Sequence, residues 1–121
     1  MIEYTYEVNA PYTCVLTKVP EAEREHGCRD AIALFVCPVE SERSRVWIRM
    51  AMADATSDAD DLVAFQDTIF GQDRPVIESQ RPKRLPIGLD PSITELHSAA
   101  DRSSAAYRRY LRERGVTFGV C

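Results

Sequence analysis

The hydrophobic pattern of this chain changes its period near the middle, and this change most constrains the fold. Residues 45–53 alternate between apolar and polar side chains, which is typical of a half-buried strand. From Leu62 onward, apolar side chains recur at helical spacing. The earlier segments 4–8, 12–19 and 30–37 are rich in β-branched, aromatic and other apolar residues and are bounded by proline or polar loops. We therefore expect an antiparallel sheet followed by helices.

Two helices are expected after the strands. The first spans 57–80, because Ser57 and Asp60 resemble a capping box and acidic residues in the first turn suit the helix dipole. The second begins at a cap formed by Asp101 and ends at Gly115. The predicted fold class is α+β, with an antiparallel sheet packed against C-terminal helices.

Composition narrows the class of protein. At 121 residues, 45% apolar and 28% charged, the chain fits a single globular domain spanning residues 1–121. The net charge of −4 gives no electrostatic footprint for nucleic acid or an anionic membrane. No apolar run is long enough to span a bilayer, and the first residues do not resemble a signal peptide, so we expect a cytoplasmic protein.

The cysteines and histidines form no local metal motif. The two histidines, His26 and His97, stand alone in polar surroundings. The four cysteines lack a Cys-x-x-Cys pair, which argues against a zinc ribbon or a cluster site, and they are Cys14, Cys28, Cys37 and Cys121. We expect free thiols in a reducing compartment.

Asp73 is the candidate for chemistry, because it falls on the apolar side of the first expected helix. The apolar residues on that side are Leu62, Phe65, Ile69, Val76 and Ile77. Asp73 lies four residues after Ile69 and four before Ile77, so we expect it to point inward. A buried carboxylate is costly unless a cation, a metal or several donors compensate it. The alternative is an ion pair with Arg74 or another arginine.

Longer strings in the second half resemble a known family. They are Phe65–Gln80 with its Gln-Asp-x-x-x-x-Glu element, Leu85-Pro86, Glu95-Leu96, and Asp101–Leu111 with its Tyr-Arg-Arg helix. This part of the chain resembles the C-terminal part of the catalytic α subunit of Rieske non-heme iron aromatic-ring-hydroxylating oxygenases, in the branch close to phthalate and vanillate oxygenases. The resemblance implies part of a helix-grip fold of the START/Bet v 1 type.

The resemblance also implies a metal ligand. In that family two histidines and one carboxylate bind Fe(II), and the carboxylate precedes a Glu by five residues, as Asp73 precedes Glu78 here. Asp73 would be the metal ligand, and Glu78 would orient it from behind. The paired cysteines and histidines of a [2Fe–2S] cluster and the two spaced iron-binding histidines have no counterpart in this sequence. We therefore expect no [2Fe–2S] site, and Fe(II) absent or weakly bound.

Three functional hypotheses follow. The first is a fragment or remnant of a ring-hydroxylating dioxygenase catalytic domain, inactive until a complementing oxygenase chain supplies the histidines. The second is a small module that binds an aromatic molecule, with a pocket formed by Val46, Ile48, Met50 and Met52, although a Met-rich strand face is also typical of plain core. The third is a structural module that forms a homo-oligomer through an exposed sheet edge.

Overall fold

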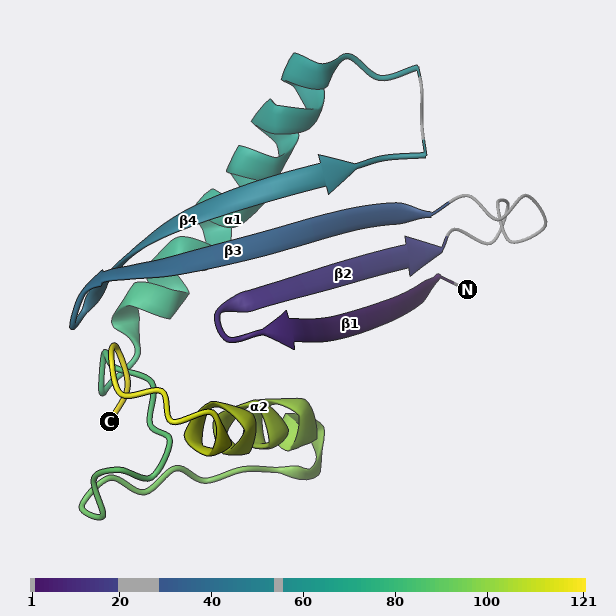
Figure 1. Ribbon diagram of the computed structural model, residues 1–121. Helices are drawn as coiled ribbons and strands as arrows, with labels where there is room; N and C mark the ends of the chain where they lie inside the picture. Colours follow the sequence, from purple (N-terminus) through teal and green to yellow (C-terminus); the bar gives the residue numbers. More distant parts are fainter. Residues whose placement is uncertain (1, 20–28, 54–55) are drawn as a thin grey trace.

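The predicted α+β class is confirmed by the computed structural model, which describes residues 2–19, 29–53 and 56–121 (Figure 1). A four-stranded antiparallel sheet precedes two C-terminal helices. The strands are β1 (Glu3–Ala10), β2 (Thr13–Val19), β3 (Asp30–Glu40) and β4 (Arg43–Ala51). The helices are α1 (Ala59–Ser79), the short 3₁₀ turn η2 (Ala99–Asp101) and α2 (Arg102–Glu113).

The strands follow one another in the order β1-β2-β3-β4, so each pairs with its neighbour in the sequence. Side chains directly opposite in antiparallel strands lie on the same face of the sheet. The register therefore defines two faces. The covered face carries Cys14, Leu34, Val36, Val46, Ile48 and Met50. The open face carries Glu7, Val15, Ala33, Phe35, Trp47 and Arg49.

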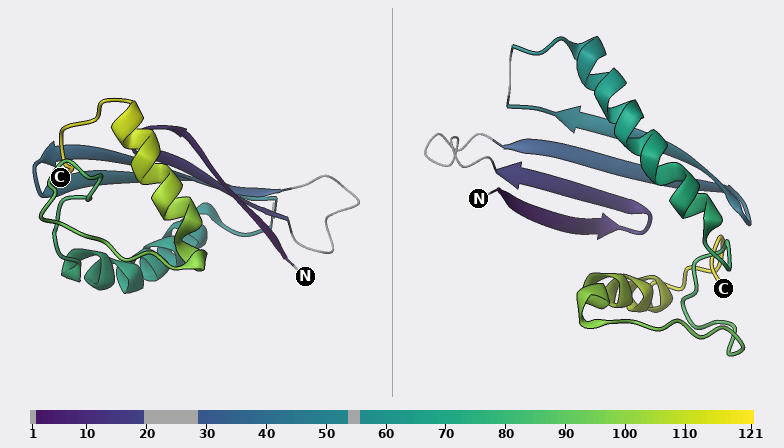
Figure 2. Two further views of the ribbon diagram at one scale, coloured as in Figure 1. Left: turned by 90° about the horizontal axis from the view of Figure 1, so that it is seen from below. Right: turned by 180° about the vertical axis from the view of Figure 1, so that it is seen from behind.

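The two faces differ in exposure. Along β4, Val46, Ile48 and Met50 are half-buried, whereas Trp47 and Arg49 are exposed. Helix α1 crosses behind β3 and β4 in Figure 1 and in front of them in the reverse view of Figure 2, while neither helix crosses the front of the sheet in Figure 1. Helix α1 thus lies on one side of the sheet, whereas α2 lies beyond the edge formed by β1 in Figure 1. No helix in the described part of the chain is long and apolar enough to cross a membrane.

Helix α1 begins one residue later than predicted. The N-cap is Asp58 rather than Ser57, and its carboxylate accepts a 2.8 Å hydrogen bond from the backbone N–H of Asp60. The helix then continues through Pro75 to Ser79 and contains no buried residue. It crosses the sheet without the close packing that buries a helix face.

The start of the last helical segment also differs from the prediction. Ser98 caps η2, and Asp101 accepts hydrogen bonds from the backbone N–H and the hydroxyl of Ser98, at 2.8 and 2.7 Å. Asp101 makes no side-chain cap to α2 itself. The cap of this helical segment therefore lies three residues earlier than expected, at Ser98, because the 3₁₀ turn precedes α2. The predicted end at Gly115 is confirmed, with φ of 69° just beyond the helix.

The best-buried core lies at the C-terminal end rather than under the sheet. Leu111 of α2 is fully buried and packs with Ile87 and Val120. The last residues of the chain run beside the segment after α1, where Leu85 and Val120 form a parallel bridge. The backbone N–H of Ile87 donates to the carbonyl of Cys121 at 2.7 Å. These contacts bring α2 back beside the sheet.

The turn between β1 and β2 was predicted incorrectly. Tyr12 was expected at the start of a strand, but β2 begins at Thr13 and Tyr12 has φ of 61°, in the left-handed region. A bulky residue adopts this conformation only where tertiary contacts support it. Here the backbone carbonyl of Tyr12 accepts a 2.8 Å hydrogen bond from Val36, and its hydroxyl donates to the carbonyl of Phe118 at 2.7 Å.

Candidate functional site

The exposure of the individual residues of α1 shows which side of the helix faces the sheet. Leu62, Gln66 and Phe70 are the half-buried residues of the helix, spaced four apart, and its other residues are exposed. Asp73 follows Gln66 by seven residues and Phe70 by three, so it continues the same helical stripe by one turn. Sequence patterning found Leu62 and Asp73 but missed Gln66 and Phe70. It also placed Phe65 and Ile69 on this side, although both are exposed. Gln66 was missed because a polar side chain does not count toward an apolar face, and the others because apolar residues of α1 occur on more than the side that faces the sheet.

The expectation that Asp73 is buried is wrong for this chain. Asp73 is exposed, as are Val76 and Ile77 on the same helix, at 62% and 60%. The physical reason is that α1 crosses the sheet without packing tightly against it, so the described residues do not cover this end of the stripe. The carboxylate thus continues the sheet-facing stripe of the helix but remains open to solvent.

The alternative for Asp73, an ion pair with Arg74, does not form. Arg74 instead donates from Nε to Glu78 Oε1 at 2.7 Å, in an exposed i,i+4 pair. The Asp73 carboxylate makes no hydrogen bond or ion pair with any other described residue. Glu78, predicted to orient Asp73, is held by Arg74 here, and its role beside a metal stays a prediction.

The described residues do not complete an iron site. Among them, no cluster of three or more His, Cys, Asp or Glu side chains could hold a metal ion. His97 lies 3.4 Å from Glu95 through Nε2 and so belongs to a different group of side chains. Cys14, Cys37 and Cys121 are free thiols, whereas His26 and Cys28 lie outside the described residues. Asp73 can offer one ligand, and a single carboxylate does not fit a 2-His-1-carboxylate centre by itself.

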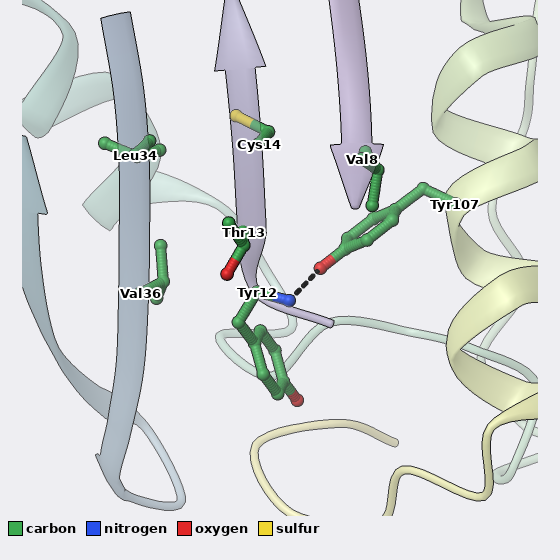
Figure 3. Close-up of a pocket in the computed structure, with 7 residues that line it drawn as sticks. All are labelled: Val8, Tyr12, Thr13, Cys14, Leu34, Val36 and Tyr107. Atoms are coloured by element: carbon green, nitrogen blue, oxygen red, sulfur yellow. Dashed lines mark hydrogen bonds between the residues drawn. The ribbon is translucent and has the colours of Figure 1, made fainter. Parts of the chain in front are cut away.

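A cavity of about 320 Å³ lies at the end of the sheet nearest α2 (Figure 3). Its lining residues are Val8, Tyr12, Thr13, Cys14, Leu34, Val36 and Tyr107. The lining is almost entirely apolar, and the volume falls within the range of small-molecule sites. This cavity is therefore a concave feature of the described chain that suits an apolar ligand.

The four residues predicted to form a substrate pocket do not line this cavity. Val46, Ile48 and Met50 lie on the covered face of β4, and Met52 follows the end of that strand. Val46 pairs with Val36, and Ile48 with Leu34, so the cavity lies one strand away on the same face. Sequence alternation identified the correct face, but it could not show where α2 closes over it.

Two tyrosines define the polar part of the cavity. The hydroxyl of Tyr107 accepts a 2.9 Å hydrogen bond from the backbone N–H of Tyr12 (Figure 3). Partial burial is the main cause that raises the pKa of the Tyr107 hydroxyl above its ordinary value, although the hydrogen bond from Tyr12 opposes the rise. The pKa of Tyr12 is also raised, by burial first and by Tyr107 second. Both phenols are therefore neutral at physiological pH.

A second polar contact anchors α2 from its other side. Arg108 binds the Glu95 carboxylate through two nitrogens: Nε contacts Oε2, and Nη2 donates to Oε1 at 2.7 Å. The two side chains are only 20% and 28% exposed. This bidentate pair ties the segment before η2 to the middle of α2. Arg108 therefore has an intramolecular partner and is not free for an acidic ligand.

Comparison with known proteins places the chain in a family. Residues 1–116 match the family described as the vanillate O-demethylase oxygenase C-terminal domain. The chain belongs to this family. The predicted resemblance to the C-terminal region of Rieske oxygenase catalytic subunits is thereby confirmed, and the similarity is to enzymes of the demethylase type.

Curated relatives agree with this assignment. The "Probable methylxanthine N7-demethylase NdmC" of Pseudomonas sp. (strain TJI-51) is 39% identical over an alignment of 121 positions, which covers 98% of this chain and 40% of that protein. The methylxanthine N1-demethylase NdmA of Pseudomonas putida is 40% identical over 78 residues, which are 64% of this chain and 20% of that protein. The chain thus spans less than half the length of these relatives.

Solved structures share the fold. A mutant of NdmA from Pseudomonas putida CBB5, the QL mutant with caffeine, superposes with a TM-score of 0.76 at 28% identity. That match covers 93% of this chain and 31% of the NdmA chain. NdmA from the same strain, without the mutations, gives a TM-score of 0.72 at 28% identity over 91% of this chain and 31% of its own. The sheet and the two helices are therefore arranged as in one part of NdmA.

Proposed function

We propose that this chain forms the C-terminal part of the catalytic domain of a Rieske-type oxygenase that removes a methyl group from a planar heteroaromatic substrate. The family match over residues 1–116 is the observation that carries the proposal. The named relatives that it resembles are methylxanthine demethylases. Within this proposal the domain is a helix-grip fold, of which the chain supplies the sheet, α1 and α2.

Asp73 is the proposed iron ligand of this chain. Its carboxylate is unpaired, continues the sheet-facing stripe of α1 and has an anionic oxygen pair suited to Fe(II). The two histidine ligands and the [2Fe–2S] cluster would come from polypeptide outside these 121 residues, because one carboxylate binds iron too weakly alone. We therefore expect the chain by itself to be inactive.

A chimera can test this proposal. The matching C-terminal segment of the Pseudomonas putida N1-demethylase would be replaced by this chain, and iron content and formaldehyde release from caffeine would be measured. We expect the folded chimera to retain iron, and Asp73→Ala to abolish both iron retention and turnover. The matched control is Asp67→Ala, an exposed carboxylate on the same helix about a third of a turn away around the axis. An Asp73→Ala chimera that keeps its iron would contradict the proposed ligand.

A second candidate function, binding of an uncharged aromatic molecule, is favoured by the cavity beside Tyr107. Val8, Leu34 and Val36 offer apolar walls. The Tyr107 hydroxyl uses a lone pair to accept from Tyr12, which leaves its proton for an acceptor such as a ligand carbonyl. Methylxanthines such as caffeine combine an uncharged planar ring with such carbonyls.

Thermal shift measurements on the whole chain would test binding. Caffeine and a series of uncharged aromatic compounds are expected to raise the melting temperature. Val36→Phe should abolish the shift, because it fills the cavity. The control is Val63→Phe on the exposed side of α1, where Val63 is 52% exposed. The absence of any shift across the series would count against this function.

A further inference from the structure

The turn between β1 and β2 places a tyrosine where the backbone favours glycine. Ala10 pairs with Thr13, so Pro11 and Tyr12 are the two central residues of the hairpin turn. Proline at the first central position and a positive φ at the second are the pattern of a type II turn. Glycine is preferred at that second position, because a Cβ strains the left-handed conformation. The Tyr12 side chain is therefore accommodated at a conformational cost.

Three hydrogen bonds to distant parts of the chain compensate this strain. The N–H of Tyr12 donates to the Tyr107 hydroxyl at 2.9 Å, and its carbonyl accepts from the N–H of Val36 at 2.8 Å. Its own hydroxyl donates to the carbonyl of Phe118 at 2.7 Å. The first two bonds use backbone atoms that any residue in this conformation would offer. The bond to Phe118 is thus the polar contact that requires a tyrosine here.

The segment that accepts this bond is itself fixed. Residues 119–121 pair with residues 85–87 through three backbone hydrogen bonds of 2.7 to 3.3 Å. Val120, in the middle of this pair, is 2% exposed and packs in the core with Leu111. Phe118 directly precedes these anchored residues, so its carbonyl is held at a defined place beside the turn. The Tyr12 hydroxyl therefore has a firm point of attachment.

Tyr12 and Tyr107 both line the cavity beside α2. Their hydrogen bond joins the β1–β2 turn to α2 on one side of that cavity (Figure 3). Relaxation of the turn to an unstrained φ would rotate the Tyr12 N–H away from Tyr107 and open this connection. The bond to Phe118 opposes the relaxation, because it holds the Tyr12 ring. A strained residue held by its surroundings is typical of ligand clamps and switch regions.

We infer that Tyr12 is a gate residue of the cavity, latched through its hydroxyl to the carbonyl of Phe118. In the latched state the turn is strained, and Tyr12 and Tyr107 close one side of the cavity. When the latch opens, the strain favours the relaxed turn, and an uncharged aromatic molecule passes between the turn and α2. The inference rests on the proposed binding function only for the identity of this molecule. The gate itself is a property of the chain without ligand.

Labelling of Cys14 with N-ethylmaleimide measures the gate without a ligand. Cys14 lines the cavity, whereas Cys37 is exposed and Cys121 is buried. Trypsin places the four cysteines in four different peptides, so mass spectrometry of the labelled whole chain gives a separate rate for each. Cys37 reports the rate of an open thiol. Cys121 reports unfolding of the core, and its rate should rise steeply with urea.

Tyr12→Phe keeps the ring but removes the latch. The Cys14 rate should rise about three- to tenfold, the factor that corresponds to the usual net worth of one hydrogen bond. Below the unfolding transition this faster rate should depend little on urea, because local opening exposes little surface. Tyr110→Phe removes a phenol of α2 that does not line the cavity, and this control should leave the Cys14 rate unchanged.

An unchanged Cys14 rate in Tyr12→Phe would overturn the inference. So would a faster rate that depends on urea as steeply as that of Cys121, because Cys14 would then be reached by unfolding rather than through the gate. Caffeine provides a separate arm of the experiment. Slower Cys14 labelling in its presence would support the proposed binding function, and a lack of protection would count against that function while leaving the result for the gate intact.

Discussion

The backbone N–H of Tyr12 donates a 2.9 Å hydrogen bond to the hydroxyl of Tyr107, 95 residues further along the chain. This bond joins the β1–β2 turn to the middle of α2 and closes one side of the cavity. Tyr12 has a left-handed φ of 61°, which costs free energy for a bulky residue. Its N–H, carbonyl and hydroxyl all find partners elsewhere in the fold. The turn is therefore held by tertiary contacts rather than by its own sequence.

Tyr107→Phe removes the acceptor of this bond and leaves a partly buried N–H unpaired. We expect the free energy of unfolding to fall by about 1–3 kcal/mol. Urea denaturation followed by circular dichroism would measure the change. Tyr110→Phe is the matched control: no hydrogen bond joins the Tyr110 hydroxyl to a described residue, and the variant keeps the ring beneath Arg114. Equal stability of the two variants would contradict the role assigned to Tyr107.

The same two phenols predict a loss of stability in alkali. Their pKa values are raised in the folded chain above the ordinary value of 10.0. Such a group contributes its full stabilisation at pH values below the pKa that it has in the unfolded chain. This contribution is lost as the pH rises through the pKa that the group has in the folded chain. We therefore expect unfolding free energy to fall above about pH 10. Tyr107→Phe should make this fall shallower than in the native chain, as measured by urea titrations between pH 8 and pH 11.

Leu111→Ala should be among the most destabilising single truncations in the described chain. Leu111 is 0% exposed and packs against Ile87 and Val120. Truncation removes its burial and leaves a cavity, which costs about 2–5 kcal/mol. Leu96→Ala provides the control, because Leu96 is 95% exposed. Thermal denaturation should separate the two variants clearly, and a Leu111→Ala chain as stable as Leu96→Ala would show that this core does not hold the fold.

Glu95→Gln tests the Arg108–Glu95 pair, which anchors α2 to the segment before η2. The change keeps the shape of the side chain but removes its charge, so the bidentate bond to Arg108 weakens. We expect a loss of about 1–2 kcal/mol, because hydrogen bonds to charged and partly buried groups exceed neutral ones. Glu78→Gln should change stability by less than about 0.5 kcal/mol, since its pair with Arg74 is exposed. Chemical denaturation of both variants at one pH provides the comparison.

Most of the secondary structure could be predicted from sequence, because side-chain periodicity is a local property. Alternation from Arg45 to Met50 identified β4 and its two faces, and the helical spacing from Leu62 identified α1. The helix stop at Gly115 followed from the left-handed conformation that glycine adopts readily. The exact caps differed, because Asp58 and Ser98 compete with neighbouring polar residues that cap equally well by type.

The candidate site, too, could be predicted only in part from the sequence. Sequence by itself determined that Asp73 lies on the helical stripe that begins at Leu62, since that position depends only on residue spacing. It could not determine exposure, which depends on how closely α1 packs against the sheet. Tertiary structure alone decided that Tyr107 closes a cavity over Leu34 and Val36, and that the Tyr12 hydroxyl reaches the carbonyl of Phe118. These relationships join residues distant in the chain, and only strand register and helix packing bring them together.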